Sequence, residues 1–179
     1  MARPTESDSA SPQLPTPAGA RALRVGCVAA TYHADLVGRM VASARRTLEQ
    51  AGLAPADFVE VSVPGAFELP LVAQRMARRD DIDAVLTFGL ILKGETEHDR
   101  HIAGAVAHAL TSVGLETGTP VLFGVLTCST LDQARARARG AEEGGLDKGG
   151  EVARAAIAVL HSLAALAATE TAGAPEETR

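Results

Sequence analysis

Four short apolar runs, separated by segments with helical periodicity, constrain the fold of this chain more than any other feature. The runs are Leu23–Ala30, Phe58–Val63, Ala84–Leu92 and Pro120–Thr127. Strands that are almost continuously apolar are typical of a parallel sheet whose two faces are both covered by helices. The sequence therefore predicts an α/β fold built on a four-stranded parallel sheet.

Five helices are expected between and after these strands. The first carries apolar residues at helical spacing between Val37 and Leu48. A glycine-containing stretch, Gly140–Gly150, is predicted to be a flexible link before the last helix. The other four helices are expected at Phe67–Arg79, around Ile102–Val113, at Leu131–Arg139 and at Val152–Ala168.

The two ends of the chain differ in composition from its centre. Residues 1–20 are rich in Pro, Ser, Thr and Ala and bury too little apolar surface to offset the entropy cost of ordering, so we expect a disordered tail. Residues 169–179 are expected to form a second flexible tail. Residues 21–168 then form one domain. The chain is 46% hydrophobic but only 3% aromatic, so its core must consist mainly of Ala, Val and Leu.

Charge and cysteine content exclude several classes of partner. The net charge is −5 and no Lys/Arg-rich block is present, which argues against nucleic-acid binding. No stretch is read as long and apolar enough to span a membrane, and no signal-peptide pattern is seen. Cys27 and Cys128 lie in apolar runs, as buried thiols do in a reducing compartment. We therefore expect a cytoplasmic protein.

Leu92–Leu110 is the segment in which chemistry is most strongly indicated. Gly94, Glu95 and Thr96 form a polar turn after an apolar strand, and His98 follows in the first turn of a helix. Free backbone N–H groups, the positive end of a helix dipole and an imidazole thus share a small volume, which suits an anionic substrate and proton transfer. The plainer alternative is a β–α turn in which Thr96 caps the helix with Asp99 as its partner.

A metal site is the weaker interpretation of the histidines in this helix. His98, His101 and His108 fall near one helical face, but a full ligand set at tight spacing is missing. We therefore expect no metal, and His101 and His108 are interpreted as surface or interface residues.

Several motifs together resemble the lumazine synthase family over roughly Leu23–Leu166. They are Val63–Pro70 (VPGAFELP), the G-x-T-x-H of Gly94–His98, Pro120–Thr127 (PVLFGVLT), Gln133–Ala134 with Arg137–Ala138, and Lys148–Gly149. The resemblance implies a flavodoxin-like three-layer αβα sandwich. It also implies condensation of 5-amino-6-ribitylaminouracil with 3,4-dihydroxy-2-butanone 4-phosphate to 6,7-dimethyl-8-ribityllumazine, with no cofactor.

The resemblance also assigns roles to residues. His98 is implied to transfer protons, and the helix dipole is expected to favour its neutral form. Gly94, Glu95, Thr96 and Arg137 are implied to bind phosphate. Core packing is the rival explanation for several of the implied pyrimidine and ribityl contacts, above all for Phe67, Phe123 and the strand end. Those contacts are Tyr32, Ala66, Phe67, Glu68, Leu90, Ile91, Leu92 and Phe123.

The resemblance further implies a homo-oligomer with shared active sites. Arg137 and Phe123 are expected to reach the site of a neighbouring subunit, although a solvated helix arginine and a buried strand phenylalanine are the alternatives. Lys148 matches a family position near the site, but the segment before it is less regular than in the family, so both a site role and no role stay open. Because the Gly140–Lys148 link looks longer than in members that form sixty-subunit shells, we expect a pentamer or a decamer.

Two other functions remain open from the sequence. Departures after the first strand (His33, Asp35) and after His98 (Asp99, Arg100) resemble a divergent subgroup of second copies. A lumazine- or flavin-binding or regulatory protein with weak or no turnover is therefore the main alternative. A generic phosphate-binding domain, which would be monomeric, is the third.

Overall fold

The sheet has the predicted four strands, all parallel. The computed structural model describes residues 12–16 and 21–172. The strands lie in the order β2-β1-β3-β4, so the chain crosses over between β2 and β3. Each pair is in continuous register, with Ala30 opposite Val63 and Leu92 opposite Cys128 at the carboxyl ends. The strand bounds are β1 Val25–Ala30, β2 Phe58–Val63, β3 Ala84–Leu92 and β4 Val121–Cys128.

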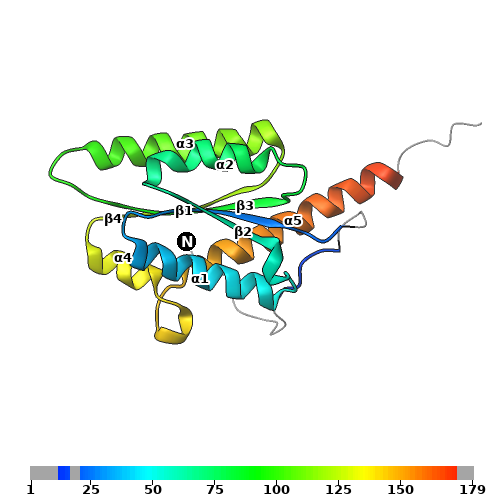
Figure 1. Ribbon diagram of the computed structural model, residues 1–179, viewed down its shortest axis with the longest axis horizontal. Helices are drawn as coiled ribbons and strands as arrows, with labels where there is room; N and C mark the ends of the chain where they lie inside the picture. Colours follow the sequence, from blue (N-terminus) through cyan, green and yellow to red (C-terminus); the bar gives the residue numbers. More distant parts are fainter. Residues whose placement is uncertain (1–11, 17–20, 173–179) are drawn as a thin grey trace, which may run out of the picture.

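Helices cover both faces of the sheet, which confirms the flavodoxin-like three-layer prediction. Figure 1 shows α2 and α3 on one face and α1, α4 and α5 on the other. The strand order 2-1-3-4 is the order expected of a flavodoxin-like doubly wound sheet. The helix bounds are α1 Ala34–Gln50, α2 Leu69–Ala77, α3 His98–Thr117, α4 Leu131–Ala138 and α5 Lys148–Ala172.

Alternation along the strands divides the core into two halves. In β1, Cys27 and Ala29 face α1, while Val28 and Ala30 face α2 and α3. Gly26 leaves room for Met76, because a Cβ at position 26 would lie 2.1 Å from the Met76 sulfur and that side chain would have to move. Each half is built largely from Ala, Val and Leu, as the low aromatic content predicts.

The helix predicted over Phe67–Arg79 consists of two pieces, a short 3₁₀ turn and an α-helix. A 3₁₀ turn spans Ala66–Glu68, and α2 follows at Leu69. Pro70 occupies the first turn of α2. Backbone N–H groups in this turn make no intrahelical hydrogen bond, so the lack of one in proline costs nothing there. The short turn places the Gly65–Glu68 backbone at the end of β2.

The predicted flexible link at Gly140–Gly150 is wrong, because this segment is ordered by hydrogen bonds. Leu146 N donates to Ala136 O at 2.9 Å and Asp147 N to Arg139 O at 3.0 Å, and α5 already begins at Lys148. Asp147 is buried, accepts a hydrogen bond from the Ser43 hydroxyl and caps α5 through Gly150 N at 3.1 Å. A glycine-rich composition therefore reflects tight turns here.

Two expectations about the chain ends are changed by the structure. Within the expected 1–20 tail, residues 1–11 and 17–20 lie outside the described residues, but Leu14 N donates to Ala51 O at 2.8 Å and holds residues 12–16 against α1. At the other end α5 continues to Ala172, past the expected boundary at 168, and residues 173–179 lie outside the described part.

The expectation that no segment could span a membrane was too strong. Among the described residues, Lys148–Thr169 within α5 is long and apolar enough by length and composition alone. Its first half packs in the core through Val152, Ala156 and Ile157, which accounts for its apolar character there. A core helix of a soluble protein passes the same test, so this feature is weak evidence for a membrane span.

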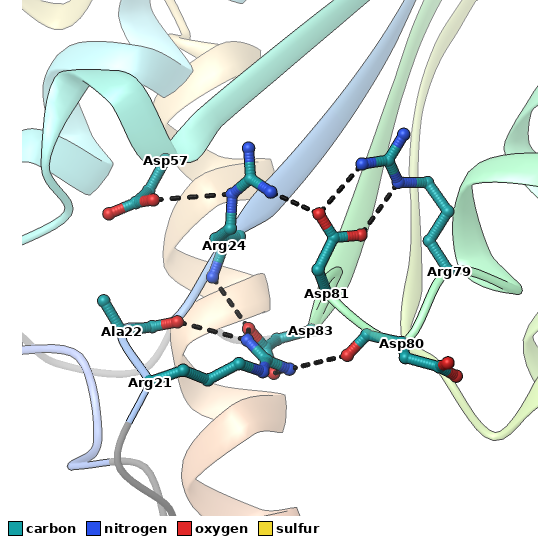
Figure 2. Close-up of polar contacts among 8 residues, drawn as sticks. All are labelled: Arg21, Ala22, Arg24, Asp57, Arg79, Asp80, Asp81 and Asp83. Atoms are coloured by element: carbon teal, nitrogen blue, oxygen red, sulfur yellow. Dashed lines mark hydrogen bonds and ion pairs between the residues drawn. The ribbon is translucent and has the colours of Figure 1, made fainter.

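A network of ion pairs lies at the amino end of the sheet, opposite the carboxyl edge (Figure 2). Arg21 pairs with Asp83 at 2.7 Å, and Asp83 also accepts a hydrogen bond from Arg24 N at 2.7 Å. Arg24 pairs with Asp81. Arg79 also donates two hydrogen bonds of 2.8 Å to the Asp81 carboxylate. These contacts tie the start of β1 to the loop before β3.

Removing the Asp147 side chain is expected to destabilise the fold. Asp147→Ala leaves the Ser43 hydroxyl and Gly150 N–H without their acceptor, which should lower the free energy of unfolding by about 2 to 3 kcal/mol. Asp147→Asn retains an acceptor and tolerates the left-handed backbone (φ 48°), so its effect should be smaller. Urea unfolding at one fixed protomer concentration measures both. Equal, near-zero effects would contradict the capping role.

Asp81 should make stability depend on pH in the acid range. Hydrogen bonds from Arg79 hold the pKa of Asp81 at about 2, below its ordinary value of 3.8. Because the folded-state pKa is lowered, this stabilisation is present above about pH 4 and is lost as the pH falls towards 2. Thermal unfolding of Asp81→Asn should show a shallower loss over that window than the parent chain. Parallel curves would mean that the pair contributes nothing.

Candidate active site

A pocket of about 310 Å³ opens at the carboxyl edge of the sheet, where chemistry was predicted. Ligands of doubly wound sheets bind at this edge because successive strands deliver their loops there. Three loops supply the walls: the one after β1, the one after β2 and the one after β3. The lining residues are Tyr32, Gly65, Ala66, Phe67, Glu68, Leu90, Ile91, Leu92, Gly94, Thr96, His98, Asp99 and Ile102.

The loop after β1 is held beside the loop after β2 by backbone hydrogen bonds. Thr31 N donates to Val63 O at 2.8 Å, and Tyr32 N donates to Pro64 O at 3.1 Å. His33 then takes a left-handed conformation (φ 59°) and starts α1. These contacts continue the β1–β2 pairing beyond the strands and place the Tyr32 ring at the mouth of the pocket.

The turn after β2 exposes the Phe67 ring and is held by a hydrogen bond to the Glu68 carboxylate. Glu68 Oε2 accepts a hydrogen bond from Gly65 N at 3.0 Å, which fixes the turn between β2 and α2. Phe67 is 63% exposed and Tyr32 is 69% exposed, so neither ring is core filler. The alternative that placed Phe67 in the core is therefore wrong. Two open aromatic faces suit a flat heterocycle.

The loop after β3 supplies the polar wall. Leu90 and Ile91 are buried at the strand end, and α3 begins at His98. Glu97 occupies the N-cap position, which corrects the alternative in which Thr96 is the cap. The Thr96 hydroxyl accepts a hydrogen bond from His98 N at 3.4 Å. His98 therefore lies at the start of the helix and within the pocket lining, as the motif predicts.

Four predicted site residues do not line this pocket. Glu95 is exposed on the loop, Phe123 is 41% exposed on the edge strand β4, and Lys148 pairs with Glu151 at 2.7 Å. Arg137 donates to Gln133 O at 3.2 Å from α4, on the opposite face of the sheet from α3 (Figure 1). Within one protomer these side chains are separated from the other predicted site residues.

Arg137 lies close to the carboxyl end of β4. Burial raises the pKa of the Cys128 thiol, and the positive charge of Arg137 opposes that rise. Arg137 is half-buried, and its guanidinium contacts its own helix at Gln133 O and not the pocket of its own subunit.

Three lining residues were not assigned to the site from the sequence. Gly65 belongs to the Val63–Pro70 motif, Ile102 to the predicted helix around Ile102–Val113, and Asp99 is the partner in the alternative Thr96 cap. Ile102 lies one helical turn after His98, so the i, i+4 spacing could have placed it on the same wall. Asp99 gives no such signal, because consecutive residues of a helix point in different directions.

The described residues show no cluster of three His, Cys, Asp or Glu side chains arranged to hold a metal ion. Neither His101 nor His108 lines the pocket. The apolar walls and the imidazole are instead suited to a flat organic substrate whose reaction moves protons.

Comparison with known proteins identifies the family. The sequence model described as 6,7-dimethyl-8-ribityllumazine synthase matches residues 22–164. The chain belongs to this family. A 6,7-dimethyl-8-ribityllumazine synthase of Kineococcus radiotolerans is 43% identical over 147 residues, 81% of this chain and 88% of that protein. One from Halobacterium salinarum is 42% identical over 78% of this chain and 98% of that protein.

Family membership favours the enzyme over the two alternatives. Lumazine synthases are transferases, and the matched region includes all three loops that line the pocket. A generic phosphate-binding domain would share the fold but would not match this family over nearly the whole described body. The regulatory alternative is not favoured by relatives that are named synthases.

Proposed function

We propose that this pocket is the active site at which the chain, a cytoplasmic lumazine synthase, condenses 5-amino-6-ribitylaminouracil with 3,4-dihydroxy-2-butanone 4-phosphate. The observation that carries the proposal is the pocket itself. Ten of the predicted site residues, from three loops, the end of β3 and the start of α3, line one volume of about 310 Å³. Both substrates are small enough to occupy a site of this kind.

We expect different lining residues to bind the two substrates. Tyr32 and Phe67 offer exposed rings on which the pyrimidine can stack, and the ends of Leu90–Leu92 offer backbone groups to its polar edge. Gly94 and Thr96 line the pocket just before α3, and we expect their backbone N–H groups to bind the phosphate. Glu68 is already engaged with Gly65, so its first role is to hold the turn.

His98 is proposed to move the protons of the reaction. Attack of the amine on the ketone, imine formation, loss of phosphate and ring closure each require proton transfer, and imidazole is the side chain best suited to give and take protons near neutral pH. Its place in the pocket lining at the start of α3 puts it next to the proposed phosphate end of the site.

Replacing His98 should reduce turnover more than binding. His98→Ala is expected to lower kcat by about 100-fold or more, with a smaller effect on affinity for 6,7-dimethyl-8-ribityllumazine. Absorbance of the product measures the rate, and fluorescence titration measures the affinity. His101→Ala, on the same helix but outside the pocket, is the matched control. Equal losses of rate and affinity would argue against proton transfer.

We propose that the site is completed by a neighbouring subunit in a pentamer or a decamer. Arg137 and Phe123 match family site positions but do not line their own protomer's pocket, and both lie at or near the β4 edge. A bidentate guanidinium would add positive charge to a phosphate site whose own lining residues include neither lysine nor arginine. Native mass spectrometry tests the assembly, and a megadalton particle would contradict the expected size.

Arg137 should affect one substrate selectively. Arg137→Ala is expected to raise the KM for the butanone phosphate by about tenfold or more, with little change for the aminouracil. Arg135→Ala, in the same helix and paired with Asp132 at 2.9 Å, is the control and should change neither value. An unchanged KM in Arg137→Ala would remove this residue from the site.

Mixed oligomers test whether sites are shared. A sample refolded from equal amounts of His98→Ala and Arg137→Ala chains contains boundaries at which one subunit supplies an intact His98 and its neighbour an intact Arg137. Random mixing makes roughly a quarter of all boundaries of this kind. At a butanone phosphate concentration well below its KM, activity should therefore rise about two- to threefold above that of Arg137→Ala, the more active of the two variants under this condition. Activity that stays at the level of the variants would place both residues in the same subunit.

The main alternative, a lumazine- or flavin-binding protein, makes a distinct prediction in the same assay. The wild-type chain should form 6,7-dimethyl-8-ribityllumazine faster than the spontaneous reaction of the two substrates. Tight binding of the lumazine without such acceleration would favour the binding protein.

A further inference from the structure

Asp99 is a carboxylate in the pocket wall that the proposed chemistry has not used. It lies in the first turn of α3, directly after His98, and its side chain is partly buried. Among residues 12–16 and 21–172, no hydrogen bond or ion pair engages its carboxylate oxygens. Because Asp99 lines the pocket and no group among the described residues engages its carboxylate, that carboxylate is available to accept a hydrogen bond from a ligand.

The other acidic side chains at this edge are already engaged. Glu68 accepts the Gly65 N–H at 3.0 Å, and Glu97 pairs with Arg100 at 3.2 Å outside the pocket. The Thr96 hydroxyl already accepts from His98 N. Asp99 is therefore the lining carboxylate most available to a substrate in the part of the chain that the structure describes.

The surroundings of Asp99 favour a neutral ligand group that donates hydrogen bonds. Much of the lining is apolar, with Ile102, Leu92 and the ring of Phe67 among its members. A negative charge in such a wall attracts hydroxyl and amino groups and repels a phosphate. The aminouracil substrate carries hydroxyls along its ribityl chain and N–H groups on its ring, whereas the other substrate carries phosphate.

We propose that Asp99 is a specificity-determining residue that accepts a hydrogen bond from the aminouracil substrate and repels phosphate from the part of the wall that Asp99 itself forms. The inference rests on the proposed function, since it assigns one substrate to one wall of that site. It gives the pocket a polarity: Asp99 selects the uncharged substrate, while Gly94, Thr96 and a neighbour's Arg137 select the anionic one.

The two substrates should respond to Asp99 with opposite sign. In Asp99→Ala we expect the KM for 5-amino-6-ribitylaminouracil to rise about tenfold, because a hydrogen bond to a charged acceptor is lost. Inhibition by inorganic phosphate should become stronger, because a nearby negative charge is removed. Asp99→Asn should lie between the parent chain and Asp99→Ala for the aminouracil. A purely structural role would not move the two quantities in opposite directions.

Glu97→Gln provides the matched control. It removes the same charge at the start of the same helix, but Glu97 does not line the pocket. Phosphate inhibition in this variant should strengthen by the same amount or less, and the KM for the aminouracil should stay unchanged. If both variants change the aminouracil KM equally, or neither does, the proposal for Asp99 is overturned even though turnover by the parent chain would stand.

A failure of the proposed function is distinguished by the parent chain. If that chain does not accelerate product formation, fluorescence titration with 6,7-dimethyl-8-ribityllumazine replaces the kinetic readout. Weaker binding in Asp99→Ala than in Glu97→Gln would uphold the contact with the ribityl-bearing ligand, and equal binding would overturn it.

Discussion

Parallel pairing of β1 with both β2 and β3 is the constraint on which the rest of the molecule depends. In a parallel sheet every strand ends at the same edge, so loops far apart in sequence are delivered to one place. Here the register sets Ala30 beside Val63, and the hydrogen bonds of Thr31 and Tyr32 extend that pairing into the loops. The pocket exists because three such loops meet above the end of β3.

The same geometry limits what one protomer can bring together. Helices that follow β1 and β4 lie on one face of the sheet, and those that follow β2 and β3 lie on the other (Figure 1). Arg137, on α4, is therefore separated from the wall that His98 and Thr96 form on the α3 side. In the function we propose, one protomer therefore supplies the aromatic rings and the imidazole, and an adjacent subunit supplies Arg137 to the phosphate.

Stability is concentrated away from the chemistry. The arginine–aspartate network of Figure 2 lies at the amino end of the sheet, and the Asp147–Ser43 contact fixes α5 against α1. Gly149 permits this close packing, because a Cβ there would lie 2.1 Å from Met40 O. The pocket side chains Tyr32 and Phe67, in contrast, are largely exposed.

The sequence predicted the parts of the structure that burial and motif spacing control. The strands were found because both faces of β1 and β3 are buried, which removes polar residues from the pattern. His98 and the Val63–Pro70 turn were found because their motifs follow strand ends. The 140–150 segment was misread because its glycines serve tight turns around Asp147, whose partner Ser43 lies 104 residues away. Asp99 was read as a cap because local sequence does not reveal which side of a helix faces a pocket.

The most direct test of this account is a crystal structure of the assembled protein with 6,7-dimethyl-8-ribityllumazine and inorganic phosphate bound. The account predicts the heterocycle between Tyr32 and Phe67, the ribityl chain on the side of Asp99, and phosphate at Gly94–Thr96. It also predicts that the guanidinium touching that phosphate is Arg137 of an adjacent protomer. Product bound at another surface, or phosphate held without Arg137, would contradict it.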